Sequence, residues 1–474
     1  MMSVAFAVAA LAGNDVRLCG TPSDFDSVST DSRNIKPGEL FLALRGERFD
    51  GHAFVRDVLK AGAVAAVVDS AWAAENVTEG LSLFVVDDTR LAFGALAAAW
   101  RRTFRIPVIG VVGSNGKTTV KEMIASILAA EVGAEHRLAT TGNLNNDIGV
   151  PTMLLRLNAM HQAAVIEMGM NHPGETAELA AMTEATVGII NNAQREHQEF
   201  MKTVAAVAEE HAALIAALPA DGIAVLNADD EFFEYWKGVA GGRRIMSFGF
   251  GAAADVRFVS ASAATQGTDV IRLATPQGDC EARLATVGAH NIRNALGAAA
   301  AALAAGCSLA GVMAGLEAFR PIKGRLQKHA AQGGSTVIDD SYNANPDSVR
   351  AAIDVLHSFS GPRVLVLGDM GEVGDAGEQY HTEIGAYARE RGIDALLTLG
   401  EMTRATVTAF GVGATHFDSA EALLQALQPM LSEKTTVLVK GSRFMRMERI
   451  VEALRLPVQP EPHQNSSEGT HHAA

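Results

Sequence analysis

The sequence predicts an α/β fold divided into three domains. Its 474 residues are too many for a single core, because soluble domains usually hold about 100 to 200 residues. Short apolar runs alternate with helix-like stretches along most of the chain, a pattern typical of mostly parallel sheets covered by helices. Apolar residues make up 48% of the chain and aromatic residues only 5%, which favours helix packing through small side chains. We expect a small N-terminal α/β domain (1–105), a central domain with a mostly parallel sheet (106–320), a C-terminal doubly wound, Rossmann-like domain (321–456) and a polar, disordered tail (457–474).

Charge and cysteine content exclude several classes of protein. The formal net charge of −15 argues against a general nucleic-acid binder, because binding to a phosphate backbone depends on lysine and arginine. The cysteines are odd in number and far apart, which suits a reducing compartment and provides no metal-binding spacing; they are Cys19, Cys280 and Cys307. Residues 1–13 are apolar but lack the basic start and the cleavage pattern of a signal peptide. We therefore expect an opening helix and a cytoplasmic protein.

One apolar stretch is long enough to cross a membrane. Residues 294–316 carry no charge and outnumber the ~20 residues that a spanning helix needs. The stretch consists mostly of alanine and glycine, which provide little driving force for insertion into lipid, and Gly306 interrupts it. The sequence therefore favours two tightly packed helices in a soluble domain over a membrane span.

The N-terminal domain contains one polar segment with possible ligand-binding side chains. Residues 40–88 alternate short apolar runs with a helix-like stretch, and Ser32 and Arg33 lie in a turn just before them. Asp50 precedes a glycine and a histidine farther along. A hydroxyl and a guanidinium before a strand could bind an anionic ligand, but a solvated loop with a capping aspartate is an equally good interpretation.

A phosphate-binding loop is predicted at the start of the central domain. The apolar run 108–112 suits a buried strand, and residues 120–130 have helical periodicity. Between strand and helix, backbone N–H groups can converge on phosphate oxygens, aided by the positive end of the helix. Val111 stands where the strict Walker motif has glycine, so only the shorter G-x-x-G-K-T form is present, and a chance glycine turn is the alternative. The loop comprises Gly113, Ser114, Asn115, Gly116, Lys117, Thr118 and Thr119.

Polar residues follow the next predicted strands of this domain. Asn143 and Asn145 lie in a polar loop, and the strand 163–166 leads directly into Glu167. A carboxylate at the carboxyl end of a parallel strand, beside the phosphate strand, is well placed to bind magnesium. A further strand, 187–192, is followed by His197, for which a surface residue and a metal ligand are both reasonable interpretations.

The rest of the chain supplies further candidates. Residues 244–287 are rich in β-type residues and contain a hairpin signal at 275–278, after which Asn291 and Asn294 open the alanine-rich helices. Asn294 could bind an adenine edge or cap a helix. In the C-terminal domain, predicted strands end at polar groups, as a doubly wound sheet would place them. These groups are Asp340, Tyr342, Asn343 and Asn345 after one strand and Lys440, Ser442 and Arg443 after the last; Arg325 lies near the start of the domain.

Taken together, these motifs resemble the ATP-dependent Mur ligases of bacterial peptidoglycan synthesis, over residues 25 to 450. The resemblance is carried by segments 113–119, 143–149, 167–169, 290–294 and 324–325, together with His197. Segments 340–346 and 440–443 are similar to the branch that adds D-alanyl-D-alanine, and the Asn-Pro-Arg signature of the branch that adds a diamino acid is missing from the sequence.

The resemblance implies a central ATPase domain and a two-step reaction that uses ATP and Mg²⁺. A carboxylate of UDP-N-acetylmuramoyl-tripeptide would form an acyl phosphate, which the amine of D-alanyl-D-alanine would then attack. A monomer is expected, without nucleic-acid partners. The sequence leaves open which diamino acid occupies the third position of the peptide.

The resemblance also implies roles for the candidate residues. Lys117 would bind the outer phosphates, Thr118 and Glu167 one magnesium ion, and His197 a second. Asn143 and Asn145 would line the reaction centre. The nucleotide would contact the phosphate loop, Asn291, Asn294, Arg325 and Asp340; the other substrates would contact Ser32, Arg33, Asp50, Tyr342, Asn343, Asn345, Lys440, Ser442 and Arg443.

The chain departs from the family pattern at one position. The family usually carries a carbamylated lysine about fourteen residues after the metal-binding histidine, and here that position is His211. We expect His211, or the adjacent Glu210, to replace that lysine as a metal-side ligand or a hydrogen-bond partner. A second metal site of different construction is the alternative.

Two other functions are compatible with parts of the sequence. Another ligase of the same superfamily, such as an earlier amino-acid-adding Mur ligase or a folylpolyglutamate-type enzyme, would share the phosphate loop. A nucleotide-gated binding protein without turnover would need the loop, but not Glu167, His197 and a third domain together.

Overall fold

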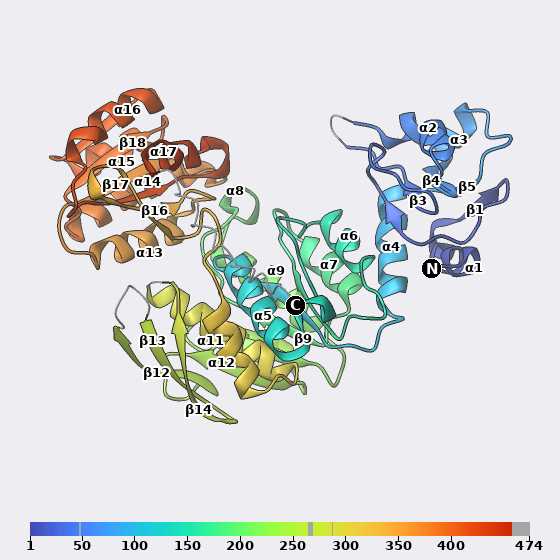
Figure 1. Cartoon of the computed structure of the whole chain (residues 1–474), viewed down its shortest axis with the longest axis horizontal. Helices are drawn as coiled ribbons and strands as arrows, with labels where there is room; N and C mark the ends of the chain where they lie inside the picture. The colour runs from blue at the N-terminus through green and yellow to red at the C-terminus, as the bar shows by residue number, and fades with distance from the viewer. Residues whose placement is uncertain (47–48, 264–268, 287, 457–474) are drawn as a thin grey trace, which may run out of the picture. The chain divides into compact units, whose positions relative to one another are not determined.

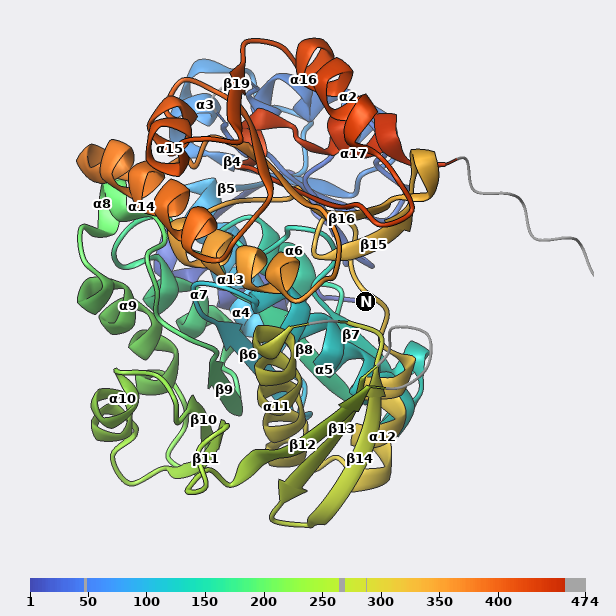
Figure 2. The ribbon, with the colours of Figure 1, turned by 90° about the vertical axis from the view of Figure 1, so that its left-hand side faces the viewer.

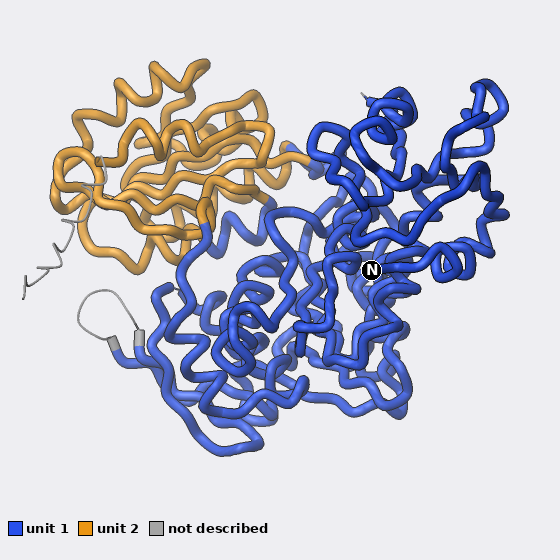
Figure 3. Tube along the Cα trace, turned by 45° about the vertical axis from the view of Figure 1, so that its right-hand side comes forward, with its two compact units in different colours: residues 1–322, 345–351, 372–377 blue, residues 323–344, 352–371, 378–474 orange. Residues whose placement is uncertain are grey.

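The computed structural model describes residues 1–46, 49–263, 269–286 and 288–456. The predicted disordered tail, 457–474, lies outside these residues. The chain forms two compact units (Figure 3), of which the first comprises residues 1–322, 345–351 and 372–377 and the second the remaining described residues from 323 onward. Each unit is considered separately below.

The N-terminal part of the first unit is a five-stranded sheet with the order β1-β5-β4-β3-β2. Strand β1 pairs antiparallel with β5 and the others pair in parallel, as expected for a small α/β domain. The predicted opening helix is present as α1. The elements are α1 (Val4–Ala10), β1 (Arg17–Cys19), β2 (Val28–Ser29), β3 (Leu40–Leu42), α2 (Val55–Lys60), β4 (Ala65–Asp69), α3 (Ser70–Glu75), β5 (Leu83–Val86) and α4 (Thr89–Arg101).

The central sheet has nine strands in the order β14-β13-β12-β11-β10-β9-β6-β8-β7. The strands from β12 to β7 along this order pair in parallel, and β12, β13 and β14 form an antiparallel extension that includes the predicted hairpin. The strands are β6 (Val108–Val112), β7 (Arg137–Ala139), β8 (Ala163–Glu167), β9 (Val187–Ile190), β10 (Ile223–Asn227), β11 (Arg244–Gly249), β12 (Val256–Ala263), β13 (Asp269–Thr275) and β14 (Gly278–Leu284).

Helices cover both faces of this sheet. Successive side chains of a strand point to opposite faces, so each strand contributes to two hydrophobic cores. On β6, Ile109 and Val111 belong to the core beneath α5, α11 and α12, whereas Val108 and Val112 belong to the core on the opposite face. Helix α11 packs against β10 and β11, beside which it lies in Figure 2. The helices are α5 (Lys117–Val132), α6 (Gly149–Leu154), α7 (Glu175–Thr183), α8 (Gln198–Met201), α9 (Val204–Ala216), α10 (Phe233–Ala240), α11 (Ala289–Ala304) and α12 (Leu309–Ala318).

The uncharged stretch 294–316 forms parts of two helices, α11 and α12, as predicted. They are separated at Gly306, whose φ is +95°. Among the described residues, no helix is long and apolar enough to span a membrane. The three cysteines are free thiols.

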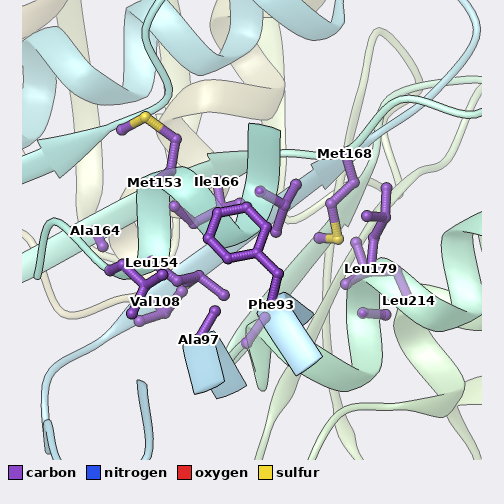
Figure 4. Packing of buried hydrophobic residues seen from close by; sticks show 14 of the residues in the cluster. Phe93, Ala97, Val108, Met153, Leu154, Ala164, Ile166, Met168, Leu179 and Leu214 are labelled. Atoms are coloured by element: carbon purple, nitrogen blue, oxygen red, sulfur yellow. The ribbon is translucent and has the colours of Figure 1, made fainter. Parts of the chain in front are cut away.

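The side chain of Phe93 joins α4 to the core of the central sheet. It is 1% exposed and packs among the residues of β6, β8 and the neighbouring helices (Figure 4). Replacing Phe93 with alanine is expected to lower the free energy of unfolding by about 3–5 kcal/mol, because the ring's burial is lost and a cavity remains. Urea denaturation would measure the change.

A matched control lies on the same helix. Leu91 is 67% exposed, so Leu91→Ala is expected to change the free energy of unfolding by less than about 0.5 kcal/mol. Equal losses in the two variants would contradict the packing role assigned to Phe93.

The second unit contains a six-stranded sheet with the order β15-β16-β20-β17-β18-β19. Strands β16, β17 and β18 of this sheet are labelled in Figure 1. Only β15 pairs antiparallel, so the predicted doubly wound arrangement is confirmed. Strand β20, the last in sequence, lies between β16 and β17. The elements are β15 (Gln327–Ala330), β16 (Thr336–Asp340), α13 (Pro346–His357), β17 (Arg363–Gly368), α14 (Gly377–Glu390), β18 (Ala395–Leu399), α15 (Thr403–Phe410), β19 (Ala414–Phe417), α16 (Ala420–Leu427), β20 (Thr436–Lys440) and α17 (Glu448–Leu454); α13 and α14 each begin in residues of the first unit.

Candidate active site

The predicted phosphate loop connects β6 to α5. Gly113 and Gly116 have φ values of +139° and +83°, which favour glycine. A Cβ atom on Gly116 would lie 2.5 Å from Asn294 Oδ1, so the loop is closely packed from behind. Helix α5 begins at Lys117, which places the N–H groups of its first turn, including those of Thr118 and Thr119, at the loop.

Asparagine side chains from neighbouring strands hold the loop in position. Asn191 and Asn192, just after β9, donate from Nδ2 to Asn115 O at 2.7 and 2.9 Å, and Asn192 Oδ1 accepts from Asn115 N at 2.9 Å. Asn191 Nδ2 also donates to Asn294 Oδ1 at 2.9 Å. Sequence reasoning missed the role of Asn191 and Asn192, although their place at the end of the predicted strand 187–192 was a usable signal.

Asn294 and Asn291 form part of this support. Asn294 Nδ2 donates to Asn291 Oδ1 at 3.2 Å, and both residues are 5% exposed. The N-cap of α11 is Gly288, so the alternative in which Asn294 caps a helix is wrong. The structure places both asparagines behind the phosphate loop.

Ser114 anchors the loop to the segment after β9. Its Oγ accepts from Gln194 N at 2.8 Å, and its backbone N–H donates to Asn192 O at 3.0 Å. Asn115 Nδ2 donates to Gln194 Oε1 at 2.7 Å. Asn345, which belongs to the first unit, donates from Nδ2 to Asn115 Oδ1 at 2.9 Å and accepts from Ser348 N near the start of α13.

Glu167 lies beside the loop at the carboxyl end of β8, as the sequence predicts. Strand β8 is the parallel neighbour of β6, so both strands end at the same edge of the sheet. Glu167 Oε1 accepts hydrogen bonds from Thr118 Oγ1 at 3.2 Å and Asn145 Nδ2 at 2.8 Å. Asn143, in the same loop as Asn145, is exposed.

Glu167 has a carboxylate oxygen suited to a metal ion. The side chain is 2% exposed, and Oε2 is buried with no hydrogen-bond partner in the described part of the chain. A buried anionic oxygen without a donor is costly unless a cation satisfies it. Together with the Thr118 hydroxyl, it forms a pair of hard oxygen ligands that fits Mg²⁺. No group of three or more His, Cys, Asp or Glu side chains able to hold a metal occurs in the described residues.

A second buried carboxylate, Glu196, contacts Lys117. Its Oε2 accepts from Lys117 Nζ at 3.0 Å, and Lys117 also donates to Gly113 O at 2.5 Å and Ser114 O at 3.3 Å. His211 Nε2 lies 3.0 Å from Glu196 Oε1. Burial alone would raise the pKa of Glu196, but Lys117, His211 and His197 outweigh it and lower the pKa to about 2.

Sequence reasoning missed Glu196. The structure also gives the hydrogen-bond partners of the nearby candidates His211 and Glu210. His211 is a hydrogen-bond partner of Glu196, which is one of the two roles expected for it. The other candidate, Glu210, accepts from the backbone N–H groups of Gly174 and Thr176 at 2.8 and 2.7 Å. Glu210 therefore caps the start of α7 as a hydrogen-bond partner of backbone N–H groups, and its role as a metal-side ligand stays a prediction. His197 has a φ of +47°, and its Nε2 lies 4.0 Å from Glu196 Oε2.

In the N-terminal part, the candidate residues occupy local turns. Arg33 Nε donates to Asp31 Oδ1 at 2.8 Å, and the Arg33 side chain is 84% exposed. Ser32, between them, is partly exposed. Asp50 caps the turn that begins at Gly51, because its Oδ1 accepts from His52 N at 3.0 Å. These contacts match the capped-loop interpretation and leave the Arg33 side chain at the surface.

In the second unit, the candidates gather at the carboxyl ends of β16 and β20. Asp340 and Lys440 are register partners, and their side chains form an ion pair of 2.6 Å. Lys440 Nζ also donates to Asn343 O at 2.9 Å, while Ser442 Oγ donates to Ala344 O at 3.1 Å. The guanidinium carbons of Arg325 and Arg443 lie 4.4 and 5.9 Å from the centre of the Tyr342 ring. These residues, together with Asp340, Asn343, Lys440 and Ser442, form the Tyr342 and Lys440 cluster.

Models of one protein family match most of the chain. The Mur ligase family catalytic domain matches residues 24–101, the Mur ligase middle domain residues 111–302, and the Mur ligase glutamate ligase domain residues 324–443.

Individual relatives are similar over nearly their whole length. The UDP-N-acetylmuramoyl-tripeptide–D-alanyl-D-alanine ligase of Escherichia coli is 41% identical, covering 92% of this chain and 95% of its own. The ligase of the same name from Haemophilus influenzae is 36% identical, covering 91% and 93%. A crystal structure of MurF from Acinetobacter baumannii aligns with a TM-score of 0.87 and 34% identity, covering 95% of this chain and 98% of the other. The chain therefore belongs to the Mur ligase family of ATP-dependent ligases.

Proposed function

We propose that this chain joins D-alanyl-D-alanine to UDP-N-acetylmuramoyl-tripeptide and converts ATP to ADP and phosphate. The observation that carries the chemistry is the phosphate loop with Lys117 hydrogen-bonded to it and Glu167 beside Thr118, the Oε2 atom of Glu167 being buried without a hydrogen-bond partner among the described residues. The choice of substrates rests on the function of two relatives, UDP-N-acetylmuramoyl-tripeptide–D-alanyl-D-alanine ligases that match more than nine-tenths of the chain. The reaction belongs to the synthesis of peptidoglycan precursors.

The chemistry begins with a carboxylate that an amine cannot attack directly, because its charge and resonance make it a poor electrophile. An oxygen of the peptide carboxylate attacks the γ-phosphorus of ATP, the bond to the β-phosphate oxygen breaks, and ADP leaves. The dipeptide amine then attacks the carbonyl carbon of the acyl phosphate. The resulting tetrahedral intermediate loses phosphate and a proton, and the amide bond remains.

The residues of the central domain have distinct roles in this proposal. Lys117 contacts the outer phosphates, and the loop N–H groups bind the remaining phosphate oxygens. Thr118 and Glu167 would hold Mg²⁺, with Asn145 orienting the Glu167 carboxylate. Bound Mg²⁺ offsets the negative charge that accumulates on the transferred phosphoryl group. His197 is assigned to a second ion and Asn143 to the reaction centre.

The other parts of the chain would bind the remaining substrate groups. We assign the UDP-muramyl end to domain 1–105 through Ser32, Arg33 and Asp50. Domain 321–456 would bind the dipeptide through its Tyr342 and Lys440 cluster, and the nucleotide through Arg325 and Asp340. We also propose a monomer in the cytoplasm, where UDP-linked precursors are made.

The test is ADP release from the purified protein with Mg-ATP, UDP-N-acetylmuramoyl-tripeptide and D-alanyl-D-alanine, omitting each component in turn. ADP is expected only in the complete mixture, together with a product heavier than the tripeptide nucleotide by the dehydrated dipeptide. ADP formed with a single amino acid and a shorter muramyl peptide would assign the chain to an earlier ligase. Tight ATP binding without ADP formation would favour a binding protein.

A further inference from the structure

Glu196 is a buried carboxylate that the proposed reaction does not use. Its side chain is 6% exposed and lies in the segment between β9 and α8. Each of its oxygens contacts a different partner, with Lys117 Nζ at 3.0 Å from Oε2 and His211 Nε2 at 3.0 Å from Oε1. The carboxylate is therefore held from two directions and aimed at the phosphate-loop lysine.

His211 has a defined orientation in this arrangement. It lies on α9 and is 1% exposed, so its ring cannot turn freely toward solvent. An ionised carboxylate only accepts hydrogen bonds, so the Nε2 atom of His211 must carry the proton that it shares with Glu196. His211 thus positions Glu196, and Glu196 in turn pairs with Lys117.

The ion pair between Glu196 and Lys117 affects the electrostatic free energy of nucleotide binding. Without phosphate, Glu196 neutralises Lys117, whose Nζ is also folded back onto the loop carbonyl of Gly113. A P-loop lysine contacts the β- and γ-phosphates of a bound triphosphate, at about 2.7–2.9 Å from a phosphate oxygen. A phosphate oxygen and Glu196 Oε2 that both contact Nζ can be no more than about 6 Å apart. Two anions at that distance in a partly buried site repel each other, unless a divalent cation compensates the phosphate charge.

We propose that Glu196, oriented by His211, selects the metal-bound form of the triphosphate by opposing the metal-free form at Lys117. This inference rests on the proposed function only in taking ATP as the nucleotide. Glu196 acts here as a specificity-determining residue. It is distinct from Glu167, which contacts Thr118 and not Lys117 among the hydrogen bonds of the described residues.

The experiment is equilibrium binding of ATP and ADP to the full-length protein, with excess Mg²⁺ and with EDTA. In the wild type, ATP is expected to bind much more weakly in EDTA than with Mg²⁺. In Glu196→Gln, which keeps the shape and removes the charge, the affinity for metal-free ATP is expected to rise at least tenfold, while the affinity for Mg-ATP changes less than threefold. ADP lacks the terminal phosphate, so its affinity in EDTA should rise by a smaller factor.

Two further variants make the result specific. Glu199→Gln removes an exposed charge three residues away and is expected to leave both affinities unchanged. His211→Gln retains an N–H donor for Glu196 and is expected to preserve the metal dependence of the wild type. If Glu196→Gln does not fold, Glu196→Ala provides a second test and predicts a change in the same direction.

The possible outcomes separate this inference from the proposed function. Equal loss of affinity for ATP in EDTA and in Mg²⁺ would show that Glu196 only supports the loop, and an unchanged ratio would also overturn the inference. A wild-type protein that binds ATP but forms no ligated product would contradict the proposed function alone. A wild-type protein that binds no nucleotide would overturn both.

Discussion

Lys117→Met is expected to reduce kcat/KM for ADP formation by at least about a thousandfold, because one fixed cation at a developing phosphoryl charge contributes on the order of 4 kcal/mol. Lys117 is the cation whose Nζ lies directly against the phosphate loop, at 2.5 Å from Gly113 O. Methionine keeps the unbranched apolar stem of lysine and removes only the terminal ammonium group, so the loop should retain its shape. Measurement of ADP release at saturating and limiting ATP would separate the loss in turnover from the loss in affinity.

A surface lysine provides the control for this prediction. The Lys60 side chain on α2 is 79% exposed, and Lys60→Met is expected to leave the rate of ADP formation unchanged. If Lys117→Met retained more than about a tenth of wild-type kcat/KM, the assignment of the segment 113–119 as a catalytic phosphate loop would be wrong.

Glu167→Gln is expected to lower turnover on the order of 10²- to 10³-fold and to raise the Mg²⁺ concentration required for half-maximal rate. The substitution can keep the acceptor that binds Thr118 and Asn145, but it replaces the partnerless Oε2 with an amide that repels a cation. Magnesium titrations of the rate, and binding of Mn²⁺ monitored by its paramagnetic signal, would measure both effects. The second readout does not depend on turnover.

Glu178→Gln is a matched control, because Glu178 is an exposed carboxylate on α7. It is expected to leave the magnesium dependence unchanged. A Glu167→Gln variant with the magnesium requirement and Mn²⁺ affinity of the wild type would contradict the proposed ligand role, even if its activity were low.

Several features of the site could be predicted because they depend on near neighbours in the chain. The apolar run 108–112, the glycines after it and Lys117 at the next helix occupy a single strand–loop–helix connection, so their spacing alone predicts a phosphate loop. Glu167 followed from a general property of parallel sheets, in which strands that run side by side end at the same edge. The division of residues 294–316 into two helices followed from Gly306 and from a composition of mostly alanine and glycine.

Other features could not be predicted because they depend on which strands become neighbours. Asp340 and Lys440 are 100 residues apart, and they meet because β20 inserts between β16 and β17 with these two residues in register. Asn191 supports the phosphate loop only because β9 lies beside β6. Strand order follows from burial of the whole sheet on both faces, and the pattern of a single strand does not contain it.

The sequence by itself determined the α/β class, the phosphate loop, Glu167 as a strand-end carboxylate and the resemblance to the Mur ligases, because each depends on local spacing and residue type. Only the tertiary structure decided that Glu196 lies between Lys117 and His211, that Glu210 caps a helix, and that Asn294 lies behind the phosphate loop. The physical reason is that a side chain's partner depends on the packing of α9 and α11 against the sheet, which brings together residues that are distant in sequence.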